Sequence, residues 1–251
     1  MNAATENSSR PTIVLVHGAF AESASWNGVI ARLQGAGYTA VAAANPLRSL
    51  KGDAEAVASV LGSVDGPVVL VGHSYGGAVI SNAALGQENV KALVYVAGFA
   101  PDEGESIGEL SGRLPGSTLG DTLRSVPLPD GTTDFYIRQE AYHRQFAADV
   151  PAEEAALLAA AQRPLRDVAL NEGSGSPAWK AIPSWFLVPG LDKNIPPEAQ
   201  GFMAERAAAR EVLDIEGASH AVPVSHPDEV ADLILAAVGH VEQHARHQPV
   251  H

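Results

Sequence analysis

The stretch that decides the fold is VVLVGHSYGGAV, residues 68–79. Four apolar residues lead into Gly72, and a second apolar run follows Gly77. A strand covered on both faces of a parallel sheet is a continuous apolar run. Gly72 and Gly76 enclose Ser74 and leave room for a tight reversal of the chain. The stretch therefore predicts a buried strand over 67–72, a strained turn at Ser74, and a helix over 75–85.

The same alternation of short apolar runs and helical stretches extends through most of the 251 residues. Further strands are expected at 12–16, 38–43, 91–98, 183–188 and 211–217. Further helices are expected at 24–37, 53–64, 196–209 and 227–238. Alternation of this kind indicates a parallel sheet with helical crossovers. The predicted fold class is thus α/β, with about six parallel strands flanked by helices on both faces.

The alternation stops between about residue 100 and residue 182. This segment is rich in Gly, Pro and Ser at first, and it then favours helices around 133–148 and 151–161. No strong strand pattern is present, so the segment is interpreted as a small helical cap inserted into the domain. Residues 1–10 are polar and are interpreted as a flexible leader. Residues 11–251 are interpreted as a single domain that carries the cap.

Composition excludes several classes of protein. The formal net charge of −13 disfavours nucleic acid as a partner, because phosphate backbones would be repelled. No cysteine is present, which removes disulfides, thiolate zinc sites and a cysteine nucleophile. The chain has no run of 18 apolar residues and no apolar core in its first ten, so no membrane span or signal peptide is expected. A cytoplasmic protein is the resulting prediction, and its oligomeric state stays open.

A serine hydroxyl needs a general base to act as a nucleophile, and the base needs an acid that orients it. His220 follows a late predicted strand and is the favoured base for Ser74, with His226 as second choice. His17 and His73 are expected to make structural hydrogen bonds near the site. The remaining tail histidines are interpreted as a solvated helical face, namely His240, His244, His247 and His251.

The orienting acid is expected between the nucleophile and the base in the chain. Asp192 follows the predicted strand 183–188, and Gly190 permits a turn there. Asp102 and Glu103, after the strand at 91–98, are the rival acids, and Asp214 within a strand is a poor candidate. The order Ser74, Asp192, His220 is the preferred catalytic set.

Two backbone N–H groups are needed to bind the oxyanion of an acyl-transfer intermediate. One is expected from Tyr75, the residue after the nucleophile. The other is expected from Ala19 in the loop after the first strand, which reads LVHGAF at 15–20, with Phe20 in reserve. Phe20 is also a candidate substrate contact. An apolar pocket is expected near the cap, with these aromatic residues close to it: Phe20, Phe99, Phe135, Tyr136, Tyr142, Phe146 and Trp179.

The segments VLVHGAF, VLVGHSYGG, LVPGLDKNIPP and GASHAV together resemble the α/β-hydrolase superfamily. They are most similar to its compact six-stranded branch of methyl esterases, hydroxynitrile lyases and bacterial serine esterases. The resemblance covers nearly the whole chain and is weakest over 105–175, where that branch has its cap. It implies the α/β-hydrolase fold and the triad of Ser74, Asp192 and His220.

The expected function is a serine hydrolase that cleaves small carboxylic esters through an acyl-enzyme, with no cofactor and no metal. Lyase, lactonase or amidase activity on the same triad is an alternative. Hydroxynitrile lyases of the branch carry a threonine where this chain has Gly18 and a lysine close to the catalytic histidine, where this chain has Ala221 and Val222, and this disfavours lyase activity. A small-molecule receptor that does not turn its ligand over is the alternative from another class.

Overall fold

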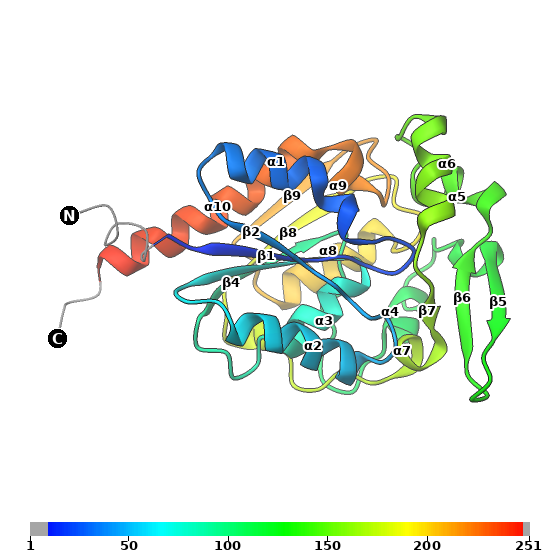
Figure 1. Ribbon diagram of the computed structural model, residues 1–251, viewed down its shortest axis with the longest axis horizontal. Coiled ribbons are helices and arrows are strands. Elements are labelled where there is room, and N and C mark those ends of the chain that lie inside the picture. Colours follow the sequence, from blue (N-terminus) through cyan, green and yellow to red (C-terminus); the bar gives the residue numbers. More distant parts are fainter. Residues whose placement is uncertain (1–9, 248–251) are drawn as a thin grey trace.

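The structure is a computed structural model and describes residues 10–247. The predicted leader at 1–10 lies outside the described residues except for Arg10, as does His251 of the predicted histidine face. Figure 1 shows a layered body with a smaller group of elements at one end of its sheet.

The sheet has six strands in the order β2-β1-β3-β4-β8-β9, and every neighbouring pair is parallel. The strands are β1 (Thr12–Val16), β2 (Ala40–Ala43), β3 (Val68–His73), β4 (Val90–Val96), β8 (Ser184–Pro189) and β9 (Glu211–Ile215). The prediction of six parallel strands is confirmed. The central strand β3 is buried along its whole length, as its unbroken apolar sequence indicates.

Helices cover both faces of this sheet (Figure 1). One face is covered by α1 (Asn27–Gly35) and α10 (Pro227–Arg246), which share a buried cluster with the sheet. The other face is covered by α2 (Leu50–Gly62), α3 (Tyr75–Ala83) and α8 (Pro197–Arg206). Along the central strands, apolar residues at alternate positions enter the two clusters, for example Val14 in one and Leu15 in the other.

Several predicted helix ends differ from the structure, among them the following two. The expected helix at 24–37 begins as a 3-10 turn, η1 (Ser23–Trp26), before α1 starts. The expected helix at 227–238 continues to Arg246 in α10. Val241 explains the extension, because it lies one turn beyond Ala237 and is buried in the same cluster. His240 and His244 therefore belong to a helix.

The cap contains strands, so the expectation that the insertion lacks them is wrong. Its three-stranded antiparallel sheet is formed by β5 (Leu123–Pro127), β6 (Thr133–Ile137) and β7 (Leu165–Arg166). Residues 133–137, expected to start a helix, form β6 instead. The missed signal is the Pro-Asp-Gly turn at 129–131, where Gly131 has a φ of 85° and Leu128 bonds to Thr132.

The cap also carries short helices around this sheet. They are α4 (Ile107–Gly112), η2 (Leu119–Thr122), α5 (Gln139–Phe146), α6 (Ala152–Ala161), α7 (Asp167–Asn171) and η3 (Ala178–Lys180). The expected helix at 151–161 corresponds to α6. Buried residues of the cap join the same cluster as α2, α3 and α8, so the cap shares a core with the sheet. It lies at the carboxyl ends of the strands (Figure 1).

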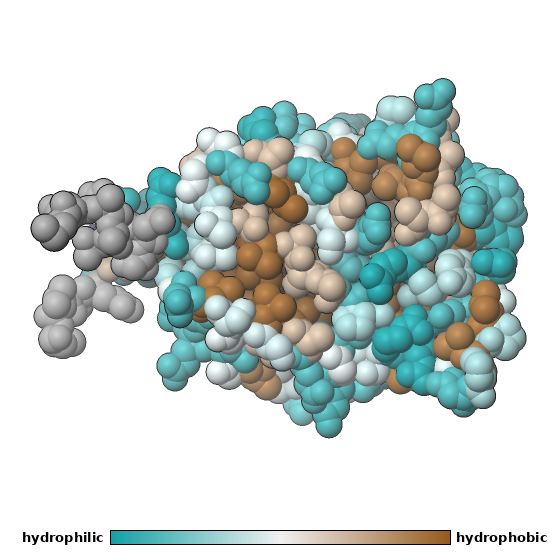
Figure 2. Space-filling view, viewed as in Figure 1, coloured by the Kyte–Doolittle hydropathy of each residue, from teal (hydrophilic) through white to brown (hydrophobic). Residues whose placement is uncertain are grey.

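The surface in this orientation carries a band of apolar residues across its middle, over the edge of the sheet where β2 lies (Figure 2). The strand β2 spans only Ala40–Ala43, and a short edge presents few unpaired backbone groups. Among residues 10–247, no helix has the length and apolar character that crossing a bilayer requires. The assignment to the cytoplasm stays a prediction.

Candidate active site

The turn between β3 and α3 holds Ser74 in a strained conformation. Its φ of 56° and ψ of −124° lie in a region that non-glycine residues seldom adopt. The flanking glycines are required by close backbone approach. A Cβ at Gly72 would lie 2.5 Å from the carbonyl oxygen of Gly76, and a Cβ at Gly76 would lie 2.4 Å from that of Val16. The predicted strand, turn and helix are confirmed.

Ser74, His220 and Asp192 form one hydrogen-bonded chain. The Ser74 Oγ lies 2.8 Å from His220 Nε2, and His220 Nδ1 lies 2.7 Å from Asp192 Oδ2. The three residues follow β3, β9 and β8, so the carboxyl ends of three parallel strands bring them together. The side chains of His220 and Asp192 are fully buried. The structure thus brings together the three residues that the sequence predicts as the catalytic set.

Asp192 is held in place by three donors besides His220. The backbone N–H groups of Asn194 and Ile195 donate to its Oδ1 at 2.8 and 3.0 Å. The Gln200 Nε2 donates to its Oδ2 at 2.9 Å. Donors on both oxygens suit an ionised carboxylate, which only accepts hydrogen bonds. His220 therefore faces a fixed acceptor at Nδ1, which leaves Nε2 free to accept from the serine.

The rival acids and the rival base lie in other surroundings. Asp102 pairs with Lys180 at 2.6 Å on the surface, and this bond lowers the pKa of the carboxyl. Glu103 and Asp214 are exposed. His226 caps the start of α10 and lies 3.3 Å from the carboxylate of Asp149. None of these side chains is hydrogen-bonded to Ser74 or His220 in the described part of the chain.

Two backbone N–H groups point to an oxyanion site next to Ser74. Within residues 10–247, the N–H groups of Ala19 and Tyr75 have no protein acceptor, and Tyr75 is the first residue of α3. The N–H of Phe20 donates to the Arg163 carbonyl at 2.9 Å, so it is not available as the reserve donor. Ala19 follows β1 and Tyr75 follows β3, which are adjacent strands. The preferred pair, Ala19 and Tyr75, therefore remains the candidate.

His17 fixes the loop that carries Ala19. Its Nε2 accepts from the Asn45 backbone N–H at 3.2 Å, and its Nδ1 donates to the Gly18 carbonyl at 2.9 Å. Burial lowers the pKa of His17, which is consistent with a neutral ring that both donates and accepts. The structural role expected for His17 fits these contacts.

His73 holds the backbone of His220. Its Nε2 donates to the His220 carbonyl at 2.8 Å, and the two rings lie 4.9 Å apart. Burial, followed by the neighbouring His220, lowers the pKa of His73 well below its usual 6.5. His73 is thus a neutral structural histidine behind the site, as expected from its place in the sequence.

The buried neutral histidines predict a loss of stability in mild acid. His17 and His73 have folded pKa values below 6.5, so only the unfolded chain binds their protons as the pH falls from 6.5. Each adds about 1.4 kcal/mol per pH unit to the slope of the unfolding free energy between 6.5 and the folded pKa. This stability is present above pH 6.5 and is lost below it.

Urea unfolding between pH 5 and pH 7.5 measures this slope. Replacing His73 with glutamine removes one titrating ring. Below pH 6.5, the slope of the unfolding free energy against pH should therefore fall by about 1.4 kcal/mol per pH unit, which corresponds to one proton. Comparison with the unmodified chain cancels the contribution of the carboxylates, and above pH 7 the two slopes should coincide. Equal slopes at pH 5–6 would contradict the assignment of a depressed pKa to His73.

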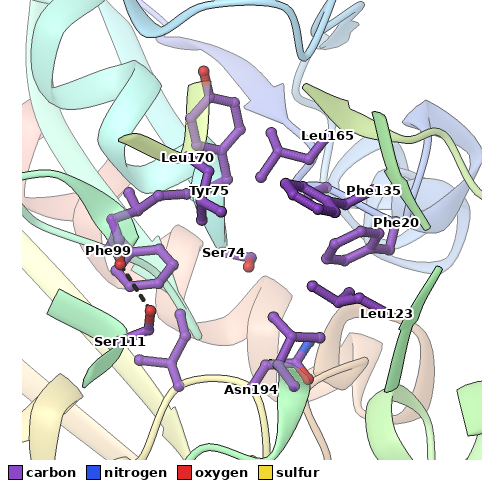
Figure 3. A pocket seen from close by; sticks show the side chains of 14 residues that line it. Phe20, Ser74, Tyr75, Phe99, Ser111, Leu123, Phe135, Leu165, Leu170 and Asn194 are labelled. Atoms are coloured by element: carbon purple, nitrogen blue, oxygen red, sulfur yellow. Dashed lines mark hydrogen bonds between the residues drawn. The ribbon is translucent and has the colours of Figure 1, made fainter. Parts of the chain in front are cut away.

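A mostly apolar pocket opens at Ser74 (Figure 3). Ser74 lies at its centre, with Phe20, Phe99 and Phe135 around it. The lining comes from the first loop, the turn after β3, the cap and the loop after β8, and it comprises Ala19, Phe20, Ser74, Tyr75, Phe99, Ile107, Ser111, Leu119, Leu123, Phe135, Leu165, Leu170, Asn194 and Ile195. The predicted apolar pocket is present.

The other aromatic candidates do not line this pocket. Tyr142 and Phe146 stack on each other in α5, and the rings of Phe146 and His220 are nearly perpendicular, with their centroids 4.9 Å apart. Trp179 donates its Nε1–H to the Pro101 carbonyl at 2.8 Å. Tyr136 lies beside the Arg124 guanidinium on the cap hairpin. These four side chains support the cap and the base.

The cap contacts the loops that carry the site. The Tyr142 hydroxyl donates to the Phe20 carbonyl at 2.6 Å, and the Ala221 N–H donates to the Phe146 carbonyl at 2.9 Å. Phe20 has a φ of 61°, a strained value for a bulky residue. Both of its backbone groups are therefore held by the cap, through Tyr142 and through Arg163. The sequence does not indicate this contact, because no local pattern marks a tyrosine that bonds 122 residues away.

Replacing Tyr142 with phenylalanine is expected to lower kcat about tenfold with a smaller change in KM. The substitution leaves the Phe20 carbonyl without its partner and loosens the loop that supplies the Ala19 N–H. Steady-state kinetics on a p-nitrophenyl ester separate the two constants. The matched control is Tyr136→Phe, in the same cap, for which no change is expected. An equal loss in both variants would contradict a positioning role for Tyr142.

Over residues 10–247, no group of three or more His, Asp or Glu side chains is arranged to hold a metal ion. The His240 and His244 rings lie 4.0 Å apart on α10, and His244 Nδ1 donates to the His240 carbonyl.

The α/β-hydrolases are defined by a hydrogen-bonded Ser-His-Asp triad at the carboxyl edge of a parallel sheet, with the serine in the turn between a strand and a helix. The family model described as "Alpha/beta hydrolase family" matches residues 13–233. The chain therefore belongs to the alpha/beta hydrolase family.

Known proteins similar to this chain include enzymes that cleave esters. The alpha/beta hydrolase nvfD of Aspergillus novofumigatus is 28% identical, over 92% of this chain and 97% of that protein. Methylesterase 7 of Arabidopsis thaliana is 25% identical over the same shares. The crystal structure of polyneuridine aldehyde esterase superposes with a TM-score of 0.78 at 21% identity, over 90% of this chain and 98% of that one.

Proposed function

We propose that this chain is a serine hydrolase of small, uncharged carboxylic esters. The single observation that carries the proposal is the continuous hydrogen-bonded chain from Ser74 through His220 to Asp192, which opens on an apolar pocket. Similarity to a methylesterase and to an esterase structure supports esters as the substrate class.

In the proposed mechanism, Ser74 Oγ attacks the acyl carbon while His220 Nε2 takes its proton. The serine is already 2.8 Å from that nitrogen, so little movement is needed before the reaction. Asp192 holds the Nδ1–H tautomer and stabilises the imidazolium as it forms. His220 then gives the proton to the departing alcohol.

The negative oxygen of the tetrahedral intermediate is bound by the N–H groups of Ala19 and Tyr75. The Tyr75 N–H lies at the start of α3, whose positive dipole end adds to the stabilisation. Removal of one such donor typically costs about 10²- to 10³-fold in kcat. Water activated by His220 then attacks the acyl-enzyme and releases the acid. No step of this proposed reaction needs a cofactor.

The surroundings of Gly18 support hydrolysis over cyanohydrin cleavage. A Cβ at Gly18 would lie 2.7 Å from Ser74 Cβ and 2.8 Å from the His73 carbonyl oxygen. The threonine that hydroxynitrile lyases of the resembling branch carry there does not fit without a backbone shift. The full triad likewise favours an enzyme over a receptor, since a receptor has no use for a polarised serine.

Active-site labelling tests the proposal directly. A fluorophosphonate forms a stable adduct with a serine that is activated as a nucleophile, and mass spectrometry of the digested chain locates it. The adduct is expected on the peptide that contains Ser74. It should be absent from the Ser74→Ala variant and from chain unfolded in urea before labelling. No adduct, or an adduct on another serine of the folded chain, would contradict the proposed nucleophile.

A further inference from the structure

The pocket at Ser74 contains one amide whose donor is uncommitted. Ser111 donates its hydroxyl to carbonyls of its own helix α4, and the Tyr75 hydroxyl donates to Asp53 at 2.6 Å. Asn194 is only 3% exposed and lines the pocket (Figure 3). Within residues 10–247, no acceptor takes a hydrogen bond from its Nδ2. A buried amide that has no protein partner and faces a cavity is placed to bind a ligand.

The orientation of this amide follows from its neighbours. The Gln145 Nε2 lies 3.0 Å from the Lys193 carbonyl oxygen, which can only accept, so the amide nitrogen of Gln145 must face it. The same Nε2 lies 2.8 Å from the Asn194 Oδ1. A flipped Asn194 would bring two donors together. The oxygen of Asn194 is therefore turned to Gln145, and its NH₂ group is left for the pocket.

The cap and the loop after β8 hold the Asn194 amide in this orientation. The Thr118 hydroxyl donates to Gln145 Oε1 at 2.8 Å, and the Ser117 hydroxyl donates to the Asn194 carbonyl at 2.8 Å. The Asn194 N–H is committed to Asp192 Oδ1. Because the backbone and the side-chain oxygen of Asn194 are both held by hydrogen bonds, its free NH₂ group is positioned for a ligand before one binds.

We infer that Asn194 binds substrate, and that the preferred esters carry a second, uncharged hydrogen-bond acceptor, a ketone or ether oxygen, apart from the scissile ester. This inference rests on the proposed function and names the substrate class within it. The scissile carbonyl oxygen faces Ala19 and Tyr75, so the acceptor for Asn194 is a different atom. Among the described residues, no basic side chain lines the pocket, so an anionic group would lose its hydration without a counter-charge.

A purely alkyl ester leaves the Asn194 donor buried without a partner. A site built to bind a polar group discriminates against analogues that lack it, because the unpaired group has lost its contact with water. For one neutral amide donor, the expected preference is about 10- to 100-fold in kcat/KM. Only the acceptor at the right distance from the ester benefits, so the preference should peak at one position.

The test compares methyl hexanoate with methyl 3-oxo-, 4-oxo- and 5-oxohexanoate, which are close to it in size. The intact chain is expected to prefer one oxo-ester about 10- to 100-fold over hexanoate. In Asn194→Leu, which is nearly isosteric, this ratio should fall to about one. In the control Ser111→Ala, the ratio should persist, because the hydroxyl removed there is committed to its own helix.

Asn194→Asp is the second variant. It keeps the oxygen that accepts from Gln145 but replaces the free donor with an acceptor. It is expected to lose the preference for the oxo-ester, and it tests the inference independently if the leucine variant does not fold. A wild-type ratio near one at all three positions, or a preference that survives both substitutions, would overturn the inference.

Binding to Ser74→Ala separates this inference from the proposed function. Calorimetric titration of that variant with the four esters gives affinities that need no turnover. A higher affinity for one oxo-ester that disappears in the double variant with Asn194→Leu supports Asn194 even if no ester is hydrolysed. Hydrolysis of all four esters at equal rates and affinities would support the esterase and overturn the role of Asn194.

Discussion

Replacing Ser74 with alanine is expected to lower kcat on p-nitrophenyl butyrate by roughly 10⁴- to 10⁶-fold. The substitution keeps the Cβ and removes only the hydroxyl, which is the atom that would form the acyl-enzyme. The oxyanion donors and the pocket remain, so a residual rate above that in water is expected. Measurement of p-nitrophenol release across esters from acetyl to decanoyl gives the size of the loss.

Two controls make the Ser74 result specific. Ser59→Ala removes an exposed hydroxyl that bonds only to its own helix, at the Glu55 carbonyl, and no change in kcat is expected. Circular dichroism and the thermal midpoint of Ser74→Ala should match those of the intact chain, because the strained turn is retained. Most of the activity surviving in Ser74→Ala would exclude this residue as the nucleophile. Release by neither protein would favour a narrower natural substrate or a receptor.

Replacing Asp192 with asparagine is expected to lower kcat by about 10⁴-fold. The backbone N–H groups of Asn194 and Ile195 both donate to Oδ1, so the amide oxygen of the variant would occupy that place. Its NH₂ group would then face His220 Nδ1 and donate to it. The histidine would be forced into the tautomer with a proton on Nε2, which cannot accept the serine proton.

The matched control for Asp192→Asn is Asp102→Asn. Asp102 follows β4 and was the other acid that the sequence left open, and it pairs with Lys180 at the surface. Its replacement should leave kcat unchanged, since exposed ion pairs contribute little and this one is remote from Ser74 in the hydrogen-bond network. A large loss in Asp102→Asn with a small one in Asp192→Asn would reverse the assignment.

The cap contacts each loop that carries the proposed machinery. Tyr142 holds the loop of Ala19, Phe146 holds the loop of His220, and Gln145 holds the loop of Asp192. All three residues belong to α5, and Phe146 makes its contact through its backbone carbonyl. Substitutions on this helix are therefore expected to change turnover as well as substrate choice, because a displaced loop alters donor positions by fractions of an ångström.

The sequence by itself determined the sheet, the turn at Ser74 and the order of the three site residues. Continuous apolar runs require burial on both faces, and only glycine fits at positions 72 and 76 against neighbouring backbone. The loops after parallel strands meet at one edge of the sheet, so Ser74, Asp192 and His220 were predictable from their places after β3, β8 and β9. These features depend on local sterics and on hydrophobic periodicity.

Only the tertiary structure decided the contents of the cap and the polar contacts it makes. The choice of Ala19 over Phe20 depends on the Arg163 carbonyl, and the free donor of Asn194 depends on Gln145, 49 residues away. Four of the five residues of β6, TDFYI, favour strands, but its pairing with β5 and β7 is decided only in the folded chain. A hydrogen-bond partner brought from a distant segment leaves no periodic pattern in the sequence, so its effect becomes visible only when the chain is folded.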